Sequence, residues 1–138
     1  MYVSFSYLDS EIEDNGPGLT KGSVIATAGK KLFEVPEWQY AARVEYSLGD
    51  ATFGIQGKYV DSRFTNLLND EETPSYVVAD FDFRYDLGVI NERMYFQLNV
   101  DNVFDELYLG NINTDLTGSR SANLGAPRSA VATLRLTF

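Results

Sequence analysis

The stretch WQYAARVEYSLGDATFGIQGKY, residues 38–59, decides the fold of this chain because its side chains alternate in character along almost its whole length. Apolar or small residues recur at every second position from Trp38 to Leu48 and from Phe53 to Tyr59, with mainly polar residues between them. A period of two puts neighbouring side chains on opposite faces of an extended strand. Since Gly49-Asp50 suits a tight turn, the stretch predicts a β-hairpin with one apolar and one polar face.

The same alternation recurs on both sides of this hairpin. The segment YVSFSYLD, residues 2–9, already has the character of a strand. Further along the chain, the apolar face is continued by Val77, Ala79, Phe81, Phe83, Tyr85, Leu87, Met94, Phe96, Leu98, Val100, Ala130, Ala132, Leu134, Leu136 and Phe138. We therefore predict an all-β chain, an antiparallel meander of about six strands, each able to hold the roughly 9–11 residues of a tilted membrane strand.

The connections between these predicted strands are of two kinds, and they alternate. Short turns are expected at Gly49-Asp50 and around Val89-Ile90-Asn91, whereas the segments near 10–34, 65–75 and 109–125 are long and polar. Short turns on one side and long loops on the other are typical of an outer-membrane barrel. No helical pattern, fixed-length repeat or domain linker interrupts this layout.

The composition excludes several classes of function. The 138 residues fit one domain, and with no Cys and no His the chain lacks thiolate chemistry and the commonest metal ligand. A net charge of −9 argues against a nucleic-acid surface. The N-terminus shows no signal peptide, and Met1 leads directly into a predicted strand, as if the chain began inside a larger fold.

Alternation alone fits two architectures. In a soluble sandwich the apolar face is a dry core, whereas in a membrane barrel it meets lipid and the polar face lines the lumen. Strands about twice the usual 5–6 residues favour the barrel, as do aromatic residues near the strand ends and charges within the strands, which a lumen tolerates better than a core. Those charges are Arg43, Glu45, Asp80, Asp82, Arg84, Asp101 and Arg135. A small soluble β-sandwich or barrel that acts as a binding module is the alternative.

Two motifs in the last forty residues identify a family resemblance. The first is NVFDELY at residues 102–108, and the second is GAPR at residues 125–128, ahead of a terminal Phe138. Together they resemble the end of a TonB-dependent outer-membrane receptor, with Val103 where the family usually has Leu. The matching motif positions are Asn102, Phe104, Asp105, Tyr108, Gly125, Pro127 and Arg128. The segments at 6–14 and 29–46 resemble the family more weakly.

The resemblance implies a fold and a function. Such receptors have a barrel of about 22 strands filled by a plug domain, and they take up scarce ligands such as siderophore-bound iron, vitamin B12 or oligosaccharides. Residues 1–138 would then be the C-terminal part of the barrel domain, without plug or signal peptide, in the outer membrane of a Gram-negative cell. Its partners would be outer-membrane lipid, the barrel-assembly machinery, the rest of the barrel and the plug, with TonB reached only through the missing N-terminal part. No cofactor is expected.

The same resemblance gives the chain end a role in assembly. Leu134, Leu136 and the terminal Phe138 fit the signal that the barrel-assembly machinery recognises, although Phe138 also suits an interfacial girdle. Thr133 stands where the fuller family pattern often has Gly. In the first motif, residues from Asn102 onward are expected to leave the membrane, with Phe104 and Tyr108 as girdle aromatics or as packing under the last loop.

Neither catalysis nor metal binding is predicted from the charged residues. The acidic runs at 9–14 and 69–72 offer the oxygen ligands that Ca²⁺ takes, but they lack EF-hand spacing and fit solvated loop charge. Asp80 and Asp82 lie on one predicted face like a carboxylate dyad. Because Arg84 follows on the same face and would keep both ionised, we expect the polar face to form a structural network of cross-strand pairs. Substrate-binding residues are not identifiable; the long loops are the expected region.

Overall fold

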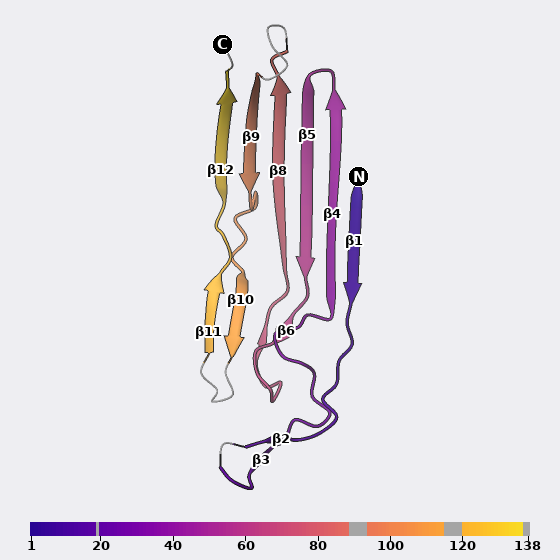
Figure 1. Cartoon of the computed structure of the whole chain (residues 1–138), viewed down its shortest axis with the longest axis vertical. Helices are drawn as coiled ribbons and strands as arrows, with labels where there is room; N and C mark the ends of the chain where they lie inside the picture. The colour runs from indigo at the N-terminus through magenta and orange to yellow at the C-terminus, as the bar shows by residue number, and fades with distance from the viewer. Residues whose placement is uncertain (19, 89–93, 115–119, 137–138) are drawn as a thin grey trace.

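The computed structural model describes residues 1–18, 20–88, 94–114 and 120–136. Its main element is one antiparallel sheet of six strands in the order β1-β4-β5-β8-β9-β12 (Figure 1). The long strands neighbour one another in chain order, so the predicted meander is confirmed. These strands are β1 (Tyr2–Tyr7), β4 (Trp38–Leu48), β5 (Ala51–Val60), β8 (Tyr76–Asp86), β9 (Tyr95–Asp101) and β12 (Ser129–Arg135).

The six strands fall into two groups by length. β4, β5 and β8 have 11, 10 and 11 residues, as a membrane-crossing strand requires, whereas β1, β9 and β12 have 6, 7 and 7. β9 ends at Asp101 because the next residue, Asn102, takes a positive φ of 49° and leaves the ladder. Just before β12 stands Pro127, which has no N–H to donate to a ladder.

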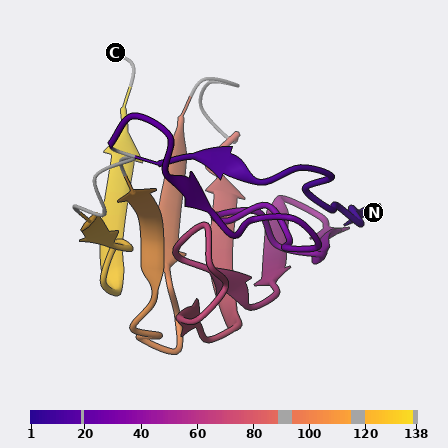
Figure 2. The same cartoon turned by 90° about the horizontal axis from the view of Figure 1, so that it is seen from below.

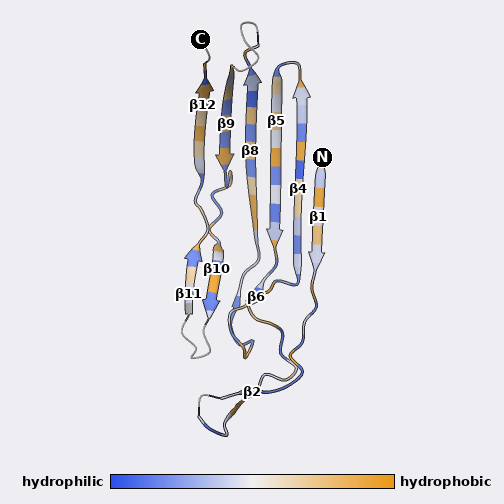
Figure 3. Ribbon diagram, in the orientation of Figure 1, coloured by the Kyte–Doolittle hydropathy of each residue, from blue (hydrophilic) through white to orange (hydrophobic). Residues whose placement is uncertain are grey.

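The register of the sheet keeps the apolar residues on one face. Paired positions include Tyr40 with Tyr59, Phe53 with Phe83 and Phe83 with Leu98. The rings of Tyr40 and Tyr59 stack with centroids 5.5 Å apart, and those of Phe53 and Phe83 lie 4.9 Å apart. Figure 3 shows the result as alternating orange and blue along the strands. Because a slip of one residue would turn every side chain to the other face, this pairing fixes the register.

The two ends of the sheet differ, as the loop lengths predict. β4 and β5 join through a tight turn at Gly49-Asp50, where Gly49 takes a φ of 59°. The described residues of the long segments 8–37, 61–75 and 102–128 lie at the opposite end (Figure 1). The second predicted short turn, at Val89-Ile90-Asn91, lies outside the described residues.

The long segments contain structure that the sequence did not reveal. Three small antiparallel hairpins extend beyond the sheet: β2 (Gly16–Pro17) with β3 (Val24–Ile25), β6 (Arg63–Phe64) with β7 (Glu72–Thr73), and β10 (Leu109–Thr114) with β11 (Arg120–Leu124). The prediction of plain loops at 10–34, 65–75 and 109–125 therefore needs refinement. These segments are rich in Gly, Asn, Ser and Thr, and they lack the regular period of two that signals a strand.

The most deeply buried side chains lie outside the middle of the sheet. They include Val60, Ile112, Thr27, Thr65, Asn66, Thr73 and Asn102, all in or beside the long segments. By contrast, apolar side chains on the sheet face are open, with Tyr46 62% and Ile55 57% exposed. Viewed from the loop end, the strands form a single open wall (Figure 2), with β1 and β12 as its edges.

No second layer covers the apolar face within the described part of the chain. The dry core of a sandwich would need a facing sheet about 10 Å away, and the described residues form none. Among the described residues there is no helix of the length and hydropathy needed to cross a membrane.

Candidate functional site

The polar face of the sheet carries an ion pair that spans three strands. The guanidinium of Arg43 on β4 donates from Nη1 to Oδ1 of Asp82 on β8 at 2.7 Å, across the intervening β5. On β5, Gly54 lies opposite Asp82 in the ladder, and a methyl group there would overlap the Asp82 carboxylate. Arg43 also pairs with Glu45 at 3.3 Å. The absence of a side chain at Gly54 thus lets the ion pair form.

A second charged group lies nearer the tight-turn end. Arg84 donates from Nε to Asp86 at 2.8 Å, and its guanidinium lies 4.0 Å from the centre of the Tyr95 ring. Asp80, on the same strand β8, lies outside this group and accepts a hydrogen bond from the backbone N–H of Asn102 at 2.9 Å.

These contacts show which partner each charged group takes. The sequence pattern predicts that Arg84 keeps Asp80 and Asp82 ionised. In the structure Arg84 pairs with Asp86, two residues further along its own strand. Asp82 is held by Arg43 and Asp80 by a backbone amide. The expected cross-strand pairing is confirmed for Arg43 and Asp82. This arrangement braces the wall and offers no acid–base dyad.

The first family motif builds a buried hydrogen-bonded centre where β9 ends. Asn102 is 2% exposed. Its Nδ2 donates to the carbonyl oxygens of Glu106 at 2.9 Å and Ala126 at 3.0 Å, and its Oδ1 accepts from the N–H of Glu106 at 2.8 Å. Asn is among the few residues that tolerate a positive φ. One side chain therefore closes the turn after β9 and ties it to the segment that leads into β12.

The other motif positions complete this clasp, which we define as residues 102–108 with 125–128. Asp105 accepts from the backbone N–H of Arg128 at 3.0 Å. The Tyr108 ring lies where a side chain at Gly125 would stand, and the Tyr108 carbonyl accepts from the N–H of Gly125 at 2.8 Å. Tyr108 also stacks on Tyr76 with ring centroids 4.5 Å apart. The two motifs, separate in sequence, meet in the structure.

Phe104 behaves differently from its neighbours in the clasp. It is 75% exposed, and Leu107 is 78% exposed. Phe104 therefore presents its ring outward beside the end of the sheet. Tyr108, by contrast, has the expected packing role, because its ring stacks on that of Tyr76.

Sequence reasoning missed the backbone partners of Asn102, which are the carbonyls of Glu106 and Ala126. Every residue carries a carbonyl, so no side-chain signal marks these two.

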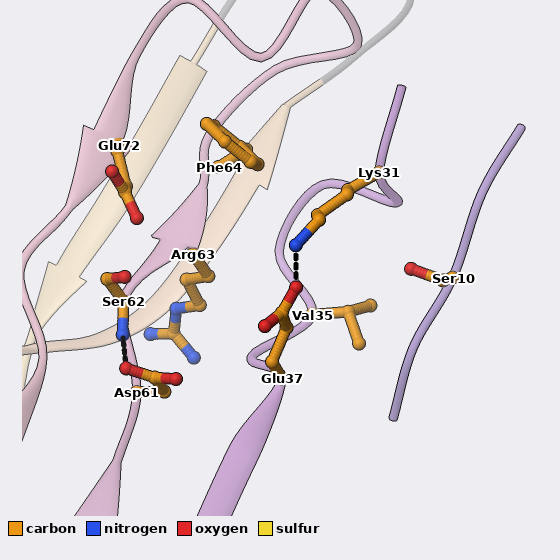
Figure 4. Close-up of a pocket in the computed structure, with 9 residues that line it drawn as sticks. All are labelled: Ser10, Lys31, Val35, Glu37, Asp61, Ser62, Arg63, Phe64 and Glu72. Carbon is orange, nitrogen blue, oxygen red and sulfur yellow. Dashed lines mark hydrogen bonds and ion pairs between the residues drawn. The ribbon is translucent and has the colours of Figure 1, made fainter. Parts of the chain in front are cut away.

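A hollow of about 240 Å³ lies on the polar face beside the clasp. Its lining comes from β5, β8, the end of β9 and the clasp: Gln56, Lys58, Tyr76, Val78, Asp80, Asp101, Asn102, Tyr108 and Ala126. A smaller cavity of about 130 Å³ lies among the long segments themselves (Figure 4). There Lys31 forms an ion pair with Glu37, and Asp61 accepts from the N–H of Ser62 at 2.9 Å.

The long segments contact one another directly. Arg63 donates from Nη2 to the carbonyl of Leu109 at 2.8 Å, joining the second segment to the third. Asn69 exchanges hydrogen bonds with the backbone of Lys31, accepting at 2.7 Å and donating at 3.0 Å, and so joins the second segment to the first.

The acidic runs show no metal centre in the described part of the chain. No group of three or more His, Cys, Asp or Glu side chains converges there in a way that could hold an ion. Asp70 instead bonds Asn66, which also caps the N–H of Leu68 at 3.1 Å. The run at 69–72 thus includes a polar turn.

The residues of the expected assembly signal are described only in part. Leu134 lies on the apolar face opposite Phe96 and is 59% exposed, and Leu136 follows the end of β12 with 47% exposed. Phe138 lies outside the described residues, so the structure adds nothing to its role.

The described residues form an open antiparallel wall with one apolar and one charged face. It has a tight turn at one end and long segments at the other. These features are typical of the outer-membrane β-barrel class. Residues 1–103 match the family model described as "TonB dependent receptor-like, beta-barrel". The chain therefore belongs to the TonB-dependent receptor family, whose members are outer-membrane receptors and transporters and not enzymes.

Named relatives agree with this family. The chain is 28% identical over 140 residues to the "Probable TonB-dependent siderophore receptor PiuA" of Acinetobacter baumannii, covering 99% of this chain and 18% of the relative. It is 26% identical over 144 residues to the "Ferrioxamine B receptor" of Salmonella typhimurium, covering 100% and 19%. The chain thus spans less than a fifth of the length of these curated relatives.

Solved structures show the same likeness in three dimensions. The crystal structure of the siderophore receptor PiuA from A. baumannii superposes with a TM-score of 0.80 at 28% identity, over 96% of this chain and 18% of that one. BauA, the ferric preacinetobactin receptor from A. baumannii, superposes with a TM-score of 0.65 at 25% identity, over 93% and 18%.

Proposed function

We propose that this chain forms a section of the barrel wall and three ligand-facing segments of a TonB-dependent siderophore receptor. The observation that carries the proposal is the structural likeness to the siderophore receptor PiuA over 96% of the chain. Siderophore uptake also fits the second relative, the ferrioxamine B receptor of S. typhimurium. Among the three ligand classes suggested by the sequence resemblance, siderophore-bound iron is therefore preferred to vitamin B12 and oligosaccharides.

Each face of the wall has its own task in this proposal. The apolar face contacts outer-membrane lipid, and the charged face, braced by Arg43 and Asp82, faces the barrel interior and its plug. The long segments and the hollow beside Lys58, Tyr76 and Tyr108 lie on the side from which ligand enters. TonB acts through parts of the receptor beyond this chain.

The proposal also covers assembly and position in the barrel. The chain takes the place of the C-terminal part of the barrel domain, because the clasp joins both motifs that resemble the end of such receptors. Leu134, Leu136 and Phe138 then form the signal read by the barrel-assembly machinery.

A chimeric receptor tests the proposal. The segment of A. baumannii PiuA that aligns with this chain is replaced by residues 1–138 in cells that lack their own siderophore receptors. We expect heat-modifiable migration of the chimera from outer-membrane fractions, as for a folded barrel, and growth on ferric siderophore under iron limitation that requires TonB.

Matched variants separate folding from transport. A chimera carrying Leu134→Arg should be lost from the outer membrane, whereas one carrying Thr133→Arg should reach it. A chimera that inserts fully but supports no TonB-dependent iron uptake with any ferric siderophore would overturn the receptor proposal. Failure of the unmodified chimera to insert would overturn the barrel placement.

A further inference from the structure

One residue bonds to two segments that are far from it in sequence. Glu34, in the first long segment, donates its backbone N–H to the carbonyl of Phe64 in the second segment at 2.7 Å. Its Oε1 accepts from the backbone N–H of Thr114 in the third segment, also at 2.7 Å. Thr114 in turn donates its hydroxyl to the carbonyl of Thr65 at 2.6 Å, which closes a ring of contacts among all three segments.

The backbone of Glu34 is held in a strained conformation. Its φ is 64°, in the left-handed region that is costly for a residue with a long side chain. Such a conformation persists only where surrounding contacts over-determine it. Here the contacts that hold it are the two bonds to other segments, so the position is set by the loops around it and not by its own local preference.

The neighbourhood of Glu34 includes two buried side chains. Thr65 is 6% exposed, and Ile112, two residues before Thr114, is also 6% exposed. The contacts of Arg63 with Leu109 and of Asn69 with Lys31 reinforce the same assembly from either side. Hydrogen bonds to a carboxylate are among the stronger ones. Glu34 and Thr114 are both half-buried, which limits the water that competes for their bond.

We propose that Glu34 is a positioning residue that joins the three long segments into a single interlocked layer. The residues of the layer then become exposed to solvent together, as one cooperative unit. A ligand therefore meets a preformed surface and not three independent loops. The inference rests on the proposed function only in placing these segments on the ligand side. Its test uses no ligand, so its failure leaves the receptor proposal intact.

Hydrogen exchange in outer-membrane vesicles from cells that produce the protein tests the interlocked layer. Glu34→Ala removes the acceptor for the N–H of Thr114. We expect roughly ten-fold faster amide exchange in all three segments, including the amide of Lys31, which bonds Asn69 and not Glu34. Thr114→Val, which keeps the backbone N–H but loses the hydroxyl bond to Thr65, should give a smaller rise in the same three segments.

Two control variants make the result specific. Glu34→Gln keeps a side-chain oxygen acceptor and should restore most of the protection, which a merely destabilised fold would not do. Glu13→Ala removes an exposed carboxylate from the same segment and should leave exchange unchanged. Faster exchange confined to residues next to position 34 would overturn the proposal, as would equal effects of Glu34→Ala and Glu13→Ala.

Discussion

At the scale of single residues, a glycine decides whether an ion pair can form. Gly54 leaves room for the Asp82 carboxylate to reach Arg43 across β5. Gly54→Ala should push that carboxylate away from Arg43 and lower the free energy of unfolding, because the ion pair is lost. Urea unfolding from vesicles, followed by the fluorescence of the single Trp38, measures this cost.

A second glycine on the same strand is the control for this substitution. Gly57 has no atom within 4 Å of the position its side chain would take, so Gly57→Ala should be nearly neutral. Equal costs at the two positions would contradict the role assigned to Gly54. In an Arg43→Met background, the cost of Gly54→Ala should shrink, because the pair is already lost.

Asn102 is the residue on which the clasp depends. Asn102→Ala removes three hydrogen bonds from a buried site and places a less tolerant residue at a φ of 49°. We expect a loss of about 2–4 kcal/mol in the same unfolding experiment. Asn102→Gly relieves the backbone strain and should cost about 1 kcal/mol less.

An exposed asparagine shows whether this loss is specific to the clasp. Asn113 on β10 is exposed, and Asn113→Ala should change the unfolding free energy by less than about 0.5 kcal/mol. A comparable loss of unfolding free energy at both asparagines would mean that the hydrogen bonds of Asn102 add no specific stability to the clasp.

At the scale of the element, β12 allows the two faces of the sheet to be tested separately. Leu134→Arg puts a charge on the lipid face and should cost roughly 2–4 kcal/mol if it lies near the bilayer midplane. Thr133→Arg, on the opposite face, should be tolerated. Folded yield in lipid bilayers compares the two variants, and equal damage would show that the faces are assigned wrongly.

The elements also show how far the sequence could predict this fold. The long strands are predictable because residues such as Tyr40, Ile55 and Phe81 repeat with a period of two and pair on one face. The three small hairpins are not, since the segments that form them lack a regular period of two. The alternation predicts a charged network on one face, but the choice of Arg43 as partner for Asp82 depends on the space above Gly54, which no local pattern encodes.

The motif residues are a different case. The sequence resemblance marks Asn102, Tyr108 and Gly125 as notable, yet gives no reason for their presence. The structure supplies one, because the amide of Asn102 and the ring of Tyr108 both reach the segment around Gly125. Glu34 has no such mark: a lone glutamate in a polar loop carries no signal, and its importance comes from partners at Phe64 and Thr114.

At the scale of the whole molecule, the wall should sit in lipid with its aromatic row at the loop end. Trp38 lies on the apolar face, its ring 4.2 Å from that of Tyr7 and 6.1 Å from that of Tyr40. Aromatic rings of this kind favour the membrane interface. Lipids brominated near the headgroup should therefore quench Trp38 fluorescence more strongly than lipids brominated at the chain end.

Moving the tryptophan by one residue gives the matched control. In a Trp38→Phe, Gln39→Trp variant the indole lies on the charged face, and brominated lipid should quench it weakly. Equal quenching at the two positions would contradict the placement of the wall. So would a folded, soluble monomer in detergent-free buffer, which would favour the binding-module alternative.

The interlocked layer has a consequence for how antibodies would recognise this chain. Residues 34, 64–65 and 114 come from three distant parts of the sequence yet meet at one place on the side proposed to face the medium. An epitope there is discontinuous, assembled from all three segments at once. A linear peptide copied from one segment would lack the bonds that shape this epitope. Immunisation with the folded layer should therefore raise antibodies that immunisation with such peptides does not raise.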